Sequence, residues 1–378
     1  MSERKKIILA VIITFVVTVM LVNIANIDFS KSNTVKKIIS SKFVQEVDEK
    51  KLDEYMAKGA AASLGDDYTF YMTAEEYGAL KSEITGEYKG IGVEVYLSSN
   101  GLTVSTVFMN SPAEKAGLKP GDIILKVAGI EVTSETYADS ISYMRGLSEE
   151  GKKAESFDIL VARGENVFDA TLTRAEIVAQ TIFSRDIDGI KYIRISSFSP
   201  STVSEFVSAI SDLENSSGLI LDVRDNPGGI LEVVSEICDI LLPECTIAST
   251  RTRDGKESVY KSDASSLNIP TVVLTNGSSA SASEILAGAL KDNKAGILVG
   301  EKTFGKGSVQ EVIPFMDKSA LKLTIAYYYT PSGVCINGSG IEPDYKVSLS
   351  EESLAKPFVS LSTQEDTQLQ KALEILNK

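Results

Sequence analysis

The sequence predicts a multidomain α/β protein, and three shifts in residue pattern along the chain support this prediction. A long apolar run stands near the start, short β-rich segments separated by turns follow, and strands then alternate with helices. Such alternation is typical of helices layered on a mostly parallel sheet. We therefore expect an N-terminal membrane helix, a helical N-terminal segment, a β-rich domain with two helices and an α/β core, in that order.

The absence of histidine from all 378 residues is the strongest constraint that composition places on function. Histidine is the usual general base near neutral pH and the commonest metal ligand, so Ser-His-Asp and Cys-His mechanisms are excluded. Cys238, Cys245 and Cys335 form no C-x-x-C pair and predict neither a zinc site nor a disulfide framework. We expect no metal and no cofactor. The formal net charge of -14 would repel phosphate backbones, so nucleic acid is not an expected partner.

Residues 1–30 are predicted to hold a cytoplasmic start and a membrane anchor. Residues 7–25 are almost all apolar and follow the basic cluster Arg4, Lys5 and Lys6. A span of roughly 20 apolar residues crosses a bilayer, whereas a cleavable signal usually has a shorter apolar region and a small-x-small exit. An uncleaved anchor is favoured over a signal peptide, which stays the alternative. The cationic start predicts a single-pass protein of the cell membrane whose residues beyond 30 lie on the extracytoplasmic side.

Residues 31–86 form the predicted helical segment. Its apolar residues recur at spacings of three and four, and Gly65 marks a break. Such a segment could pack on the body of the protein or on a second copy of the chain, so a homodimer through these helices is one expectation.

Residues 87–173 are predicted to form the β-rich domain, with strands at 91–97, 102–108, 122–127, 157–163 and 167–173 and a helix at 136–145. The run from Asn110 to Ile124, NSPAEKAGLKPGDII, resembles the signature of PDZ domains. In that family a peptide tail adds as a strand beside an exposed edge, and backbone N–H groups of a glycine-containing loop receive its carboxylate. The resemblance assigns this loop to Gly90, Ile91 and Gly92. The alternative is that these glycines only permit a bend before a strand.

Residues 174–350 are predicted to form the α/β core, and residues 351–378 a helical tail. The expected strands are 192–195, 219–223, 271–274, 297–299, 308–314 and 321–329, and the expected helices are 201–213, 231–241 and 282–291, with a closing helix at 364–376.

The candidate nucleophile is one of the serines in the segment 276–285, where a predicted strand turns into a predicted helix. A serine at such a turn is exposed above the sheet, beside unpaired helix N–H groups. The serines at this turn also suit helix capping, which is the structural alternative for Ser281 and Ser283.

Lys306 is the candidate base. Without histidine, lysine is the realistic residue to activate a serine, provided that its pKa falls by roughly three units from about 10.4 in an apolar pocket. Phe304 and the flanking glycines suit such a pocket. Strand periodicity would place Lys306, Ser308 and Gln310 on one face, where Gln310 can hold the amine without adding a negative charge.

Two motifs together resemble the catalytic motifs of the C-terminal processing peptidases, also called tail-specific proteases. They are SASASEI at 279–285 and FGKGSVQ at 304–310. The resemblance implies a crotonase-like protease core behind a PDZ domain, with Ser281 as nucleophile, Lys306 as base and Gln310 as the residue that orients it. Lys302 is a rival base outside the family's catalytic position.

The glycine turn 226–229, NPGG, follows another predicted strand. The resemblance implies that Gly228 or Gly229, with the amide of Ala282, stabilises the oxyanion; the alternative is a plain tight turn. Asp222, Asp225 and Glu284 show no metal-ligand spacing.

The predicted function is a serine endopeptidase with a Ser-Lys dyad that cleaves proteins near exposed C-terminal tails. The PDZ domain would bind the tail and gate activity. The alternatives are a catalytically silent, membrane-tethered PDZ scaffold and an acyl-transfer enzyme of crotonase-like fold.

Overall fold

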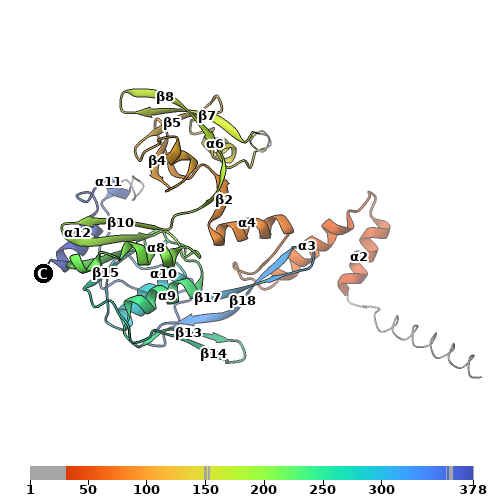
Figure 1. The fold of residues 1–378 in the computed structure, drawn as a ribbon. Coiled ribbons are helices and arrows are strands. Elements are labelled where there is room, and N and C mark those ends of the chain that lie inside the picture. The colour runs from red at the N-terminus through yellow and green to blue at the C-terminus, as the bar shows by residue number, and fades with distance from the viewer. Residues whose placement is uncertain (1–30, 149–150, 152–153, 355, 357–360, 378) are drawn as a thin grey trace, which may run out of the picture. The chain divides into compact units, whose positions relative to one another are not determined.

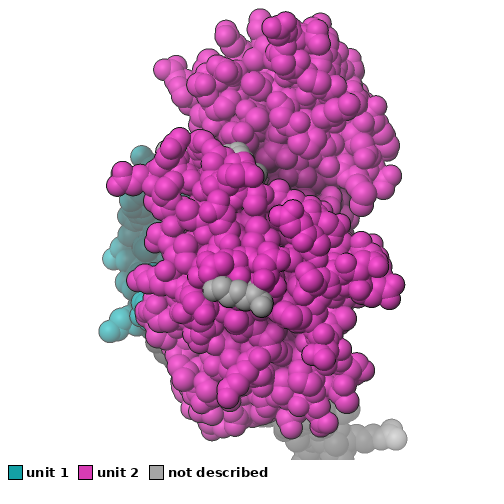
Figure 2. Space-filling view, turned by 90° about the vertical axis from the view of Figure 1, so that its left-hand side faces the viewer, with its two compact units in different colours: residues 1–74, 312–323 teal, residues 75–311, 324–378 magenta. Residues whose placement is uncertain are grey.

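A computed structural model describes residues 31–148, 151, 154–354, 356 and 361–377. The chain divides into two compact units, coloured separately in Figure 2. One comprises the residues up to Ala74 together with Val312–Leu323, and the other comprises Glu75–Glu311 and Thr324–Lys378.

The first unit contains the N-terminal helices α2 (Lys31–Lys42) and α3 (Glu49–Ala62) and the strand β1 (Phe70–Met72). The Asp48 side chain caps α3 by accepting the Lys51 N–H at 3.0 Å. β1 was not predicted; it is three residues long and exists by pairing antiparallel with residues 320–322 of a distant strand. The predicted membrane helix at 7–25 lies outside the described residues, and within them no helix is long and apolar enough to cross a bilayer.

The predicted PDZ region folds around a six-stranded sheet of order β3-β4-β5-β7-β8, with β6 paired to β5. Ser111 caps the short helix α5 by accepting the Glu114 N–H at 3.1 Å, and Pro112 occupies its first turn, as expected. Asp122 at the start of β5 is almost fully buried and accepts the Arg163 Nε–H at 2.6 Å. The bounds are β3 Val93–Ser98, β4 Gly101–Val107, α5 Pro112–Lys115, β5 Ile123–Val127, β6 Ile130–Glu131, α6 Tyr137–Met144, β7 Ser156–Arg163 and β8 Asn166–Thr173.

A two-stranded antiparallel ribbon, β2 (Glu87–Gly90) with β9 (Ala175–Val178), brings the chain into and out of this region. It follows helix α4 (Ala74–Thr85). The segment that enters the PDZ region and the segment that leaves it therefore lie side by side (Figure 1).

The α/β core is built on a six-stranded sheet of order β10-β11-β12-β15-β16-β19, parallel except for the β10–β11 pair. Successive strand residues point to opposite faces, so Leu219 and Leu221 pack with helices α8, α9 and α10, while Ile220 packs with α12. Figure 1 shows these helices around the sheet. The bounds are β10 Ile182–Ile187, β11 Ile190–Ile195, α8 Thr202–Ala209, η1 Leu213–Asn215, β12 Gly218–Asp222, α9 Leu231–Leu241, β15 Thr271–Thr275, α10 Ala282–Asp292, β16 Ile297–Gly300, β19 Tyr345–Lys346, α11 Glu351–Leu354 and α12 Thr367–Leu376.

A second core sheet has the order β1-β18-β13-β14, with β17 also paired to β18. β17 begins two residues after Lys306, so this sheet positions the candidate base. The bounds are β13 Thr246–Thr252, β14 Glu257–Lys261, β17 Ser308–Pro314 and β18 Ala320–Tyr329. The core strands β10, β13, β14 and β19 were not predicted.

Candidate active site

Ser281 is the N-cap residue of α10 and follows the turn after β15. Its φ of 56° is positive, which is uncommon for a residue with a side chain and typical of a constrained functional turn. Ser279 and Ser283 are fully buried and bind the carbonyls of Val223 and Asn226 at 2.7 and 3.0 Å. Two of the neighbouring serines therefore have structural partners, while Ser281 is only half-buried.

Glu284 connects the nucleophile turn to the lysine motif. Its carboxylate is completely buried, and its Oε2 accepts the backbone N–H of Ser281 at 2.9 Å and that of Lys306 at 2.8 Å. Its Oε1 accepts the Thr303 hydroxyl at 2.6 Å and the Gly305 N–H at 2.7 Å. One carboxylate thus fixes both candidate catalytic residues, and this role was missed at the sequence level although Glu284 stands inside the serine motif.

Gln310 lies on the same side of β17 as Ser308, as strand periodicity predicted. Its amide nitrogen donates to the Ser308 hydroxyl at 2.8 Å and to the Thr324 hydroxyl at 3.3 Å. Both N–H groups of the amide are therefore engaged, and Oε1 remains as an acceptor.

Two other residues close to Lys306 in sequence point outward. The Phe304 side chain is 58% exposed and does not supply the apolar wall that the sequence suggested. The reason is local, because Thr303 and Gly305 on either side turn inward to Glu284. Lys302, the rival base, lies at the surface and pairs with Glu342 at 3.2 Å.

The glycine turn after β12 lies directly against the nucleophile. A Cβ added to Gly228 would stand 2.8 Å from the Ser281 Cβ, and one added to Gly229 would stand 2.2 Å from the Phe198 carbonyl oxygen. The Gly228 N–H donates to Asn226 Oδ1 at 2.8 Å. Within the described part of the chain, neither Gly229 nor Ala282 has an acceptor for its backbone N–H.

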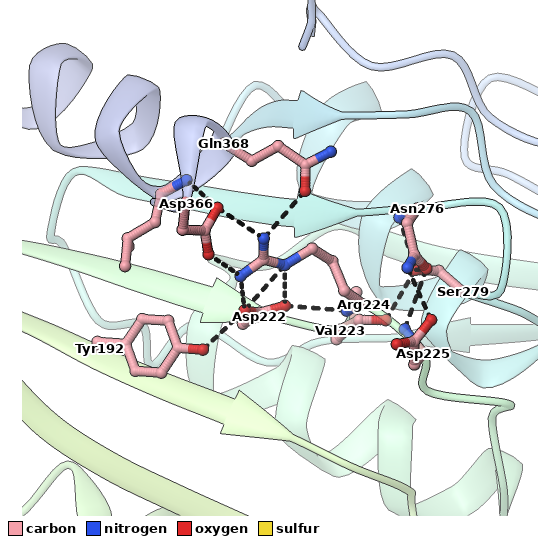
Figure 3. Close-up of polar contacts among 10 residues, drawn as sticks. Tyr192, Asp222, Val223, Arg224, Asp225, Asn276, Ser279, Asp366 and Gln368 are labelled. Carbon is pink, nitrogen blue, oxygen red and sulfur yellow. Dashed lines mark hydrogen bonds and ion pairs between the residues drawn. The ribbon is translucent and has the colours of Figure 1, made fainter. Parts of the chain in front are cut away.

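The glycine turn and the nucleophile turn are tied to each other. The Asn276 amide donates to Asp225 Oδ1 at 2.8 Å and its Oδ1 accepts the Asp225 N–H at 3.0 Å. The Ala280 N–H donates to the Asn226 carbonyl at 3.0 Å. These contacts, part of which Figure 3 shows, set the distance between the candidate oxyanion donors and Ser281.

A buried ionic network surrounds Arg224, which precedes the glycine turn in sequence (Figure 3). The Arg224 guanidinium, 2% exposed, binds Asp222 from its own strand end and Asp366 from the start of α12, with N–O distances of 2.5 and 2.8 Å. Tyr192 donates its hydroxyl to Asp222 at 2.7 Å. Burial alone would raise the pKa of Asp222, but the Arg224 charge and hydrogen bonds hold it below its ordinary value. Asp222, Asp225 and Glu284 thus each bind a different set of protein groups: Arg224 and Tyr192, Asn276, and the backbones around Ser281 and Lys306, respectively.

The predicted tail-binding loop lines a cavity of about 310 Å³ beside β3 and α6. β3 is an edge strand that pairs with β4 alone among the described strands. Gly92 has a φ of 79°, and an added Cβ would stand 2.2 Å from the Ser111 Cβ, so only glycine fits there. Burial raises the pKa of Tyr88, at the cavity edge, to about 12. The lining residues are Tyr88, Gly90, Ile91, Gly92, Val93, Val95, Ile141, Met144 and Arg145.

Three family models match the chain. One described as peptidase family S41 matches residues 189–347, one described as a PDZ domain matches residues 103–152, and one described as the activating protease CtpB N-terminal domain matches residues 20–76.

Relatives named as carboxyl-terminal processing proteases extend these matches over most of the chain. The carboxyl-terminal-processing protease of Synechocystis sp. is 38% identical over 325 residues, covering 83% of this chain and 74% of the relative. The carboxy-terminal processing protease CtpB of Bacillus subtilis is 35% identical over 335 residues, covering 85% of this chain and 68% of the relative. Among solved structures, a photosystem II D1 C-terminal processing protease aligns with a TM-score of 0.53 at 28% identity, covering 84% of this chain and 87% of that one.

Proposed function

Because this chain belongs to the carboxyl-terminal processing proteases of peptidase family S41, we propose that its serine protease activity rests on a dyad of Ser281 and Lys306. The protein is a serine-type protease that cleaves proteins near their C-terminal ends. The observation that best supports the dyad is the shared Glu284 oxygen, which holds the backbones of both residues at one point.

In the proposed reaction the Ser281 Oγ attacks the carbonyl carbon of the scissile peptide bond while its proton passes to the neutral Lys306 amine. The tetrahedral intermediate collapses when the Lys306 ammonium returns this proton to the leaving amine, which departs and leaves an acyl ester on Ser281. Water, deprotonated by Lys306, then attacks the ester, and the proton returns to Ser281 as the carboxylate product leaves.

Gln310 is the proposed orienting residue for the lysine. Ser308 and Thr324 fix its amide group, so the carbonyl oxygen is the part of the side chain that can accept a hydrogen bond from the amine. A neutral acceptor suits this role, since a carboxylate would favour the charged ammonium and weaken the base.

Gly229 and Ala282 are the proposed oxyanion donors. Their N–H groups have no acceptor within the described residues, whereas Gly228 donates to Asn226. We therefore propose that Gly228, which has no side chain, allows the turn to lie close to Ser281, and that Gly229 and Ala282 bind the oxyanion.

The PDZ cavity is the proposed site for the substrate's tail. Val93, Val95 and Ile141 give it an apolar lining, the Gly90–Gly92 loop offers backbone N–H groups for the terminal carboxylate, and Arg145 adds a positive charge at the edge. Tails that end in an apolar residue fit this lining. Tail binding would also gate the protease, which makes the PDZ domain a sensor of exposed C-termini.

A membrane tether and a homodimer complete the proposal. The apolar residues 7–25 would anchor the chain, with the protease on the extracytoplasmic side. Apolar side chains stay exposed on and near α2 and α3, namely Val35, Ile38, Phe43, Val44 and Tyr55, and a second copy of the chain would cover them.

The decisive experiment uses the purified protein with peptides whose C-termini are free or amidated. We expect cleavage of the free peptide, no cleavage by Ser281→Ala, and normal cleavage by the control Ser278→Ala, whose side chain is exposed on the same turn. Full activity of Ser281→Ala would remove the nucleophile assignment. Tail binding without any cleavage by the parent protein would instead favour a silent PDZ scaffold.

A further inference from the structure

The last helix of the chain reaches the active-site framework through Arg224. Asp366 and Gln368 stand at the start of α12, beyond residues 189–347 that match the protease family model. Arg224 Nη1 donates to Asp366 Oδ1 and to Gln368 Oε1, both at 2.9 Å, and Nη2 donates to Asp366 Oδ2 at 2.8 Å. Figure 3 shows α12 on one side of the guanidinium and Asp222 on the other.

These contacts satisfy a charge that has little access to water. The guanidinium is 2% exposed and the Asp366 side chain 5% exposed, so water cannot replace either partner. Buried groups that lose such a partner pay the cost of an unmade charged hydrogen bond, and the local backbone moves to find a substitute.

Arg224 also belongs to the segment that carries the proposed oxyanion donor. Four residues separate it from Gly229. The Arg224 N–H donates to Asp222 Oδ1 at 3.0 Å, and the next residue, Asp225, is bound to Asn276 of the nucleophile turn. The glycine turn is thus held from the nucleophile side by Asn276 and from the opposite side by the first turn of α12.

We infer that Asp366 and Gln368 are positioning residues for the oxyanion turn, acting through Arg224, and that the C-terminal helix is part of the catalytic framework. This inference rests on the proposed oxyanion role of Gly229 and Ala282. It goes beyond that proposal by giving residues outside the protease family match a role in transition-state binding.

The test compares Asp366→Asn in the full-length chain with Gln370→Ala. Asparagine keeps the ability to cap α12, where Asp366 accepts the Leu369 N–H, but it lacks the charge and one acceptor oxygen. Gln370 lies on the same helical turn, and among the described residues its side chain binds only the Gln364 carbonyl, so removing that side chain should leave activity unchanged.

For Asp366→Asn we expect kcat to fall about tenfold or more, with KM within about twofold, because an oxyanion donor acts in the transition state. A peptide boronate, which forms a tetrahedral adduct on the serine, should bind more weakly by the same factor as the loss in kcat/KM. Binding of a tail peptide to the PDZ domain should not change. A defect that is only structural would lower kcat, boronate binding and tail-peptide binding together.

A kcat within twofold of the parent, or a loss of kcat with unchanged boronate affinity, would overturn the inference. If Asp366→Asn does not fold, Gln368→Met takes its place, because methionine keeps the helix propensity and the side-chain length. The test then compares kcat and boronate affinity of this variant with those of the parent in the same way. Activity that survives Ser281→Ala would overturn the proposed function itself, whereas an inactive Ser281→Ala with an unimpaired Asp366→Asn would overturn only this inference.

Discussion

Ser281 and Lys306 donate their backbone N–H groups to the same oxygen atom, Oε2 of Glu284, over 2.9 and 2.8 Å. The two residues are 25 positions apart in sequence, one at the start of α10 and the other in the loop before β17, yet both backbones bind a single buried atom. The carboxylate lies at the start of α10, where a negative charge is favourable. It therefore fixes the dyad through the backbones of both residues.

Replacing Glu284 by glutamine should impair both catalysis and stability. All four contacts of this carboxylate are with hydrogen-bond donors. In glutamine an amide nitrogen replaces one of the two oxygens, and this nitrogen cannot accept hydrogen bonds from the two donors that it would face. We expect a loss of about 2 kcal/mol in the free energy of unfolding and at least about a tenfold fall in kcat. Chemical denaturation and steady-state kinetics measure the two effects. Glu301→Gln, which changes a less buried carboxylate close by, is the control, and an equal effect of both substitutions would contradict the assignment.

Replacing Gly229 by alanine should abolish proteolysis. The new Cβ would meet the Phe198 carbonyl oxygen at 2.2 Å, and a φ of 147° is strained for any side chain, so the turn must move. We expect kcat to fall by at least about a hundredfold, as for loss of an oxyanion donor. Gly277→Ala is the matched control, because a Cβ there has nothing within 4 Å. Similar rates for the two variants would argue against the oxyanion assignment.

Tail recognition should depend on the PDZ cavity. Ile141 lines the cavity from α6, and glutamate at this position would place a negative charge beside the terminal carboxylate. Ile141→Glu should raise KM for peptides with free C-termini, while cleavage of amidated peptides, already poor, should change little. Asp139→Ala, at an exposed position of the same helix, should match the parent. Equal cleavage of free and amidated peptides by the parent would rule out carboxylate capture.

The Asp122–Arg163 pair predicts a pH-dependent stability of the PDZ domain. Burial would raise the pKa of Asp122, but hydrogen bonds from Arg163 and the Lys119 N–H lower it overall. A lowered carboxyl pKa stabilises the fold above the unfolded value of about 3.9, and this contribution disappears as the pH falls through the folded pKa.

Asp122→Asn should therefore destabilise the domain by about 2 kcal/mol at pH 7 and by clearly less near pH 3. Urea unfolding followed by hydrogen exchange in peptides from β5 and β7 measures this difference at both pH values. Asp169→Asn, at an exposed position of β8, is the control. A difference that grows toward low pH would contradict the sign of the shift.

The sequence identified those parts of the protein whose signals are local. Helix α9 was predicted with its observed bounds, and α10 to within one residue, because apolar residues with helical spacing mark them. The family resemblance also holds. The catalytic assignments of Ser281, Lys306 and Gln310 stay predictions, now with a structural framework around them.

The parts that sequence could not show depend on long-range contacts. β1 is three residues of strand that exist because residues 320–322 pair with them. β13 and β14 have mixed polar sequences and form by pairing with each other and, for β13, with β18. Glu284 looked like a scattered acid because Gly305 and Lys306 lie 21 and 22 residues away from it, and Asp366 looked like a residue of a tail because Arg224 lies 142 residues away. Phe304 looked suited to a pocket by composition, but its neighbours turn inward and leave it exposed.

The most direct test of the dyad is the rate at which a fluorophosphonate labels the enzyme as a function of pH, with the labelled residue identified by mass spectrometry. We predict label on Ser281, a rate that rises with an ionisation well below that of free lysine at about 10.4, and a fall of about a thousandfold in Lys306→Met. Lys302→Met, which alters a surface ion pair, should label like the parent. An unchanged labelling rate in Lys306→Met, or label on a different serine, would contradict the central claim.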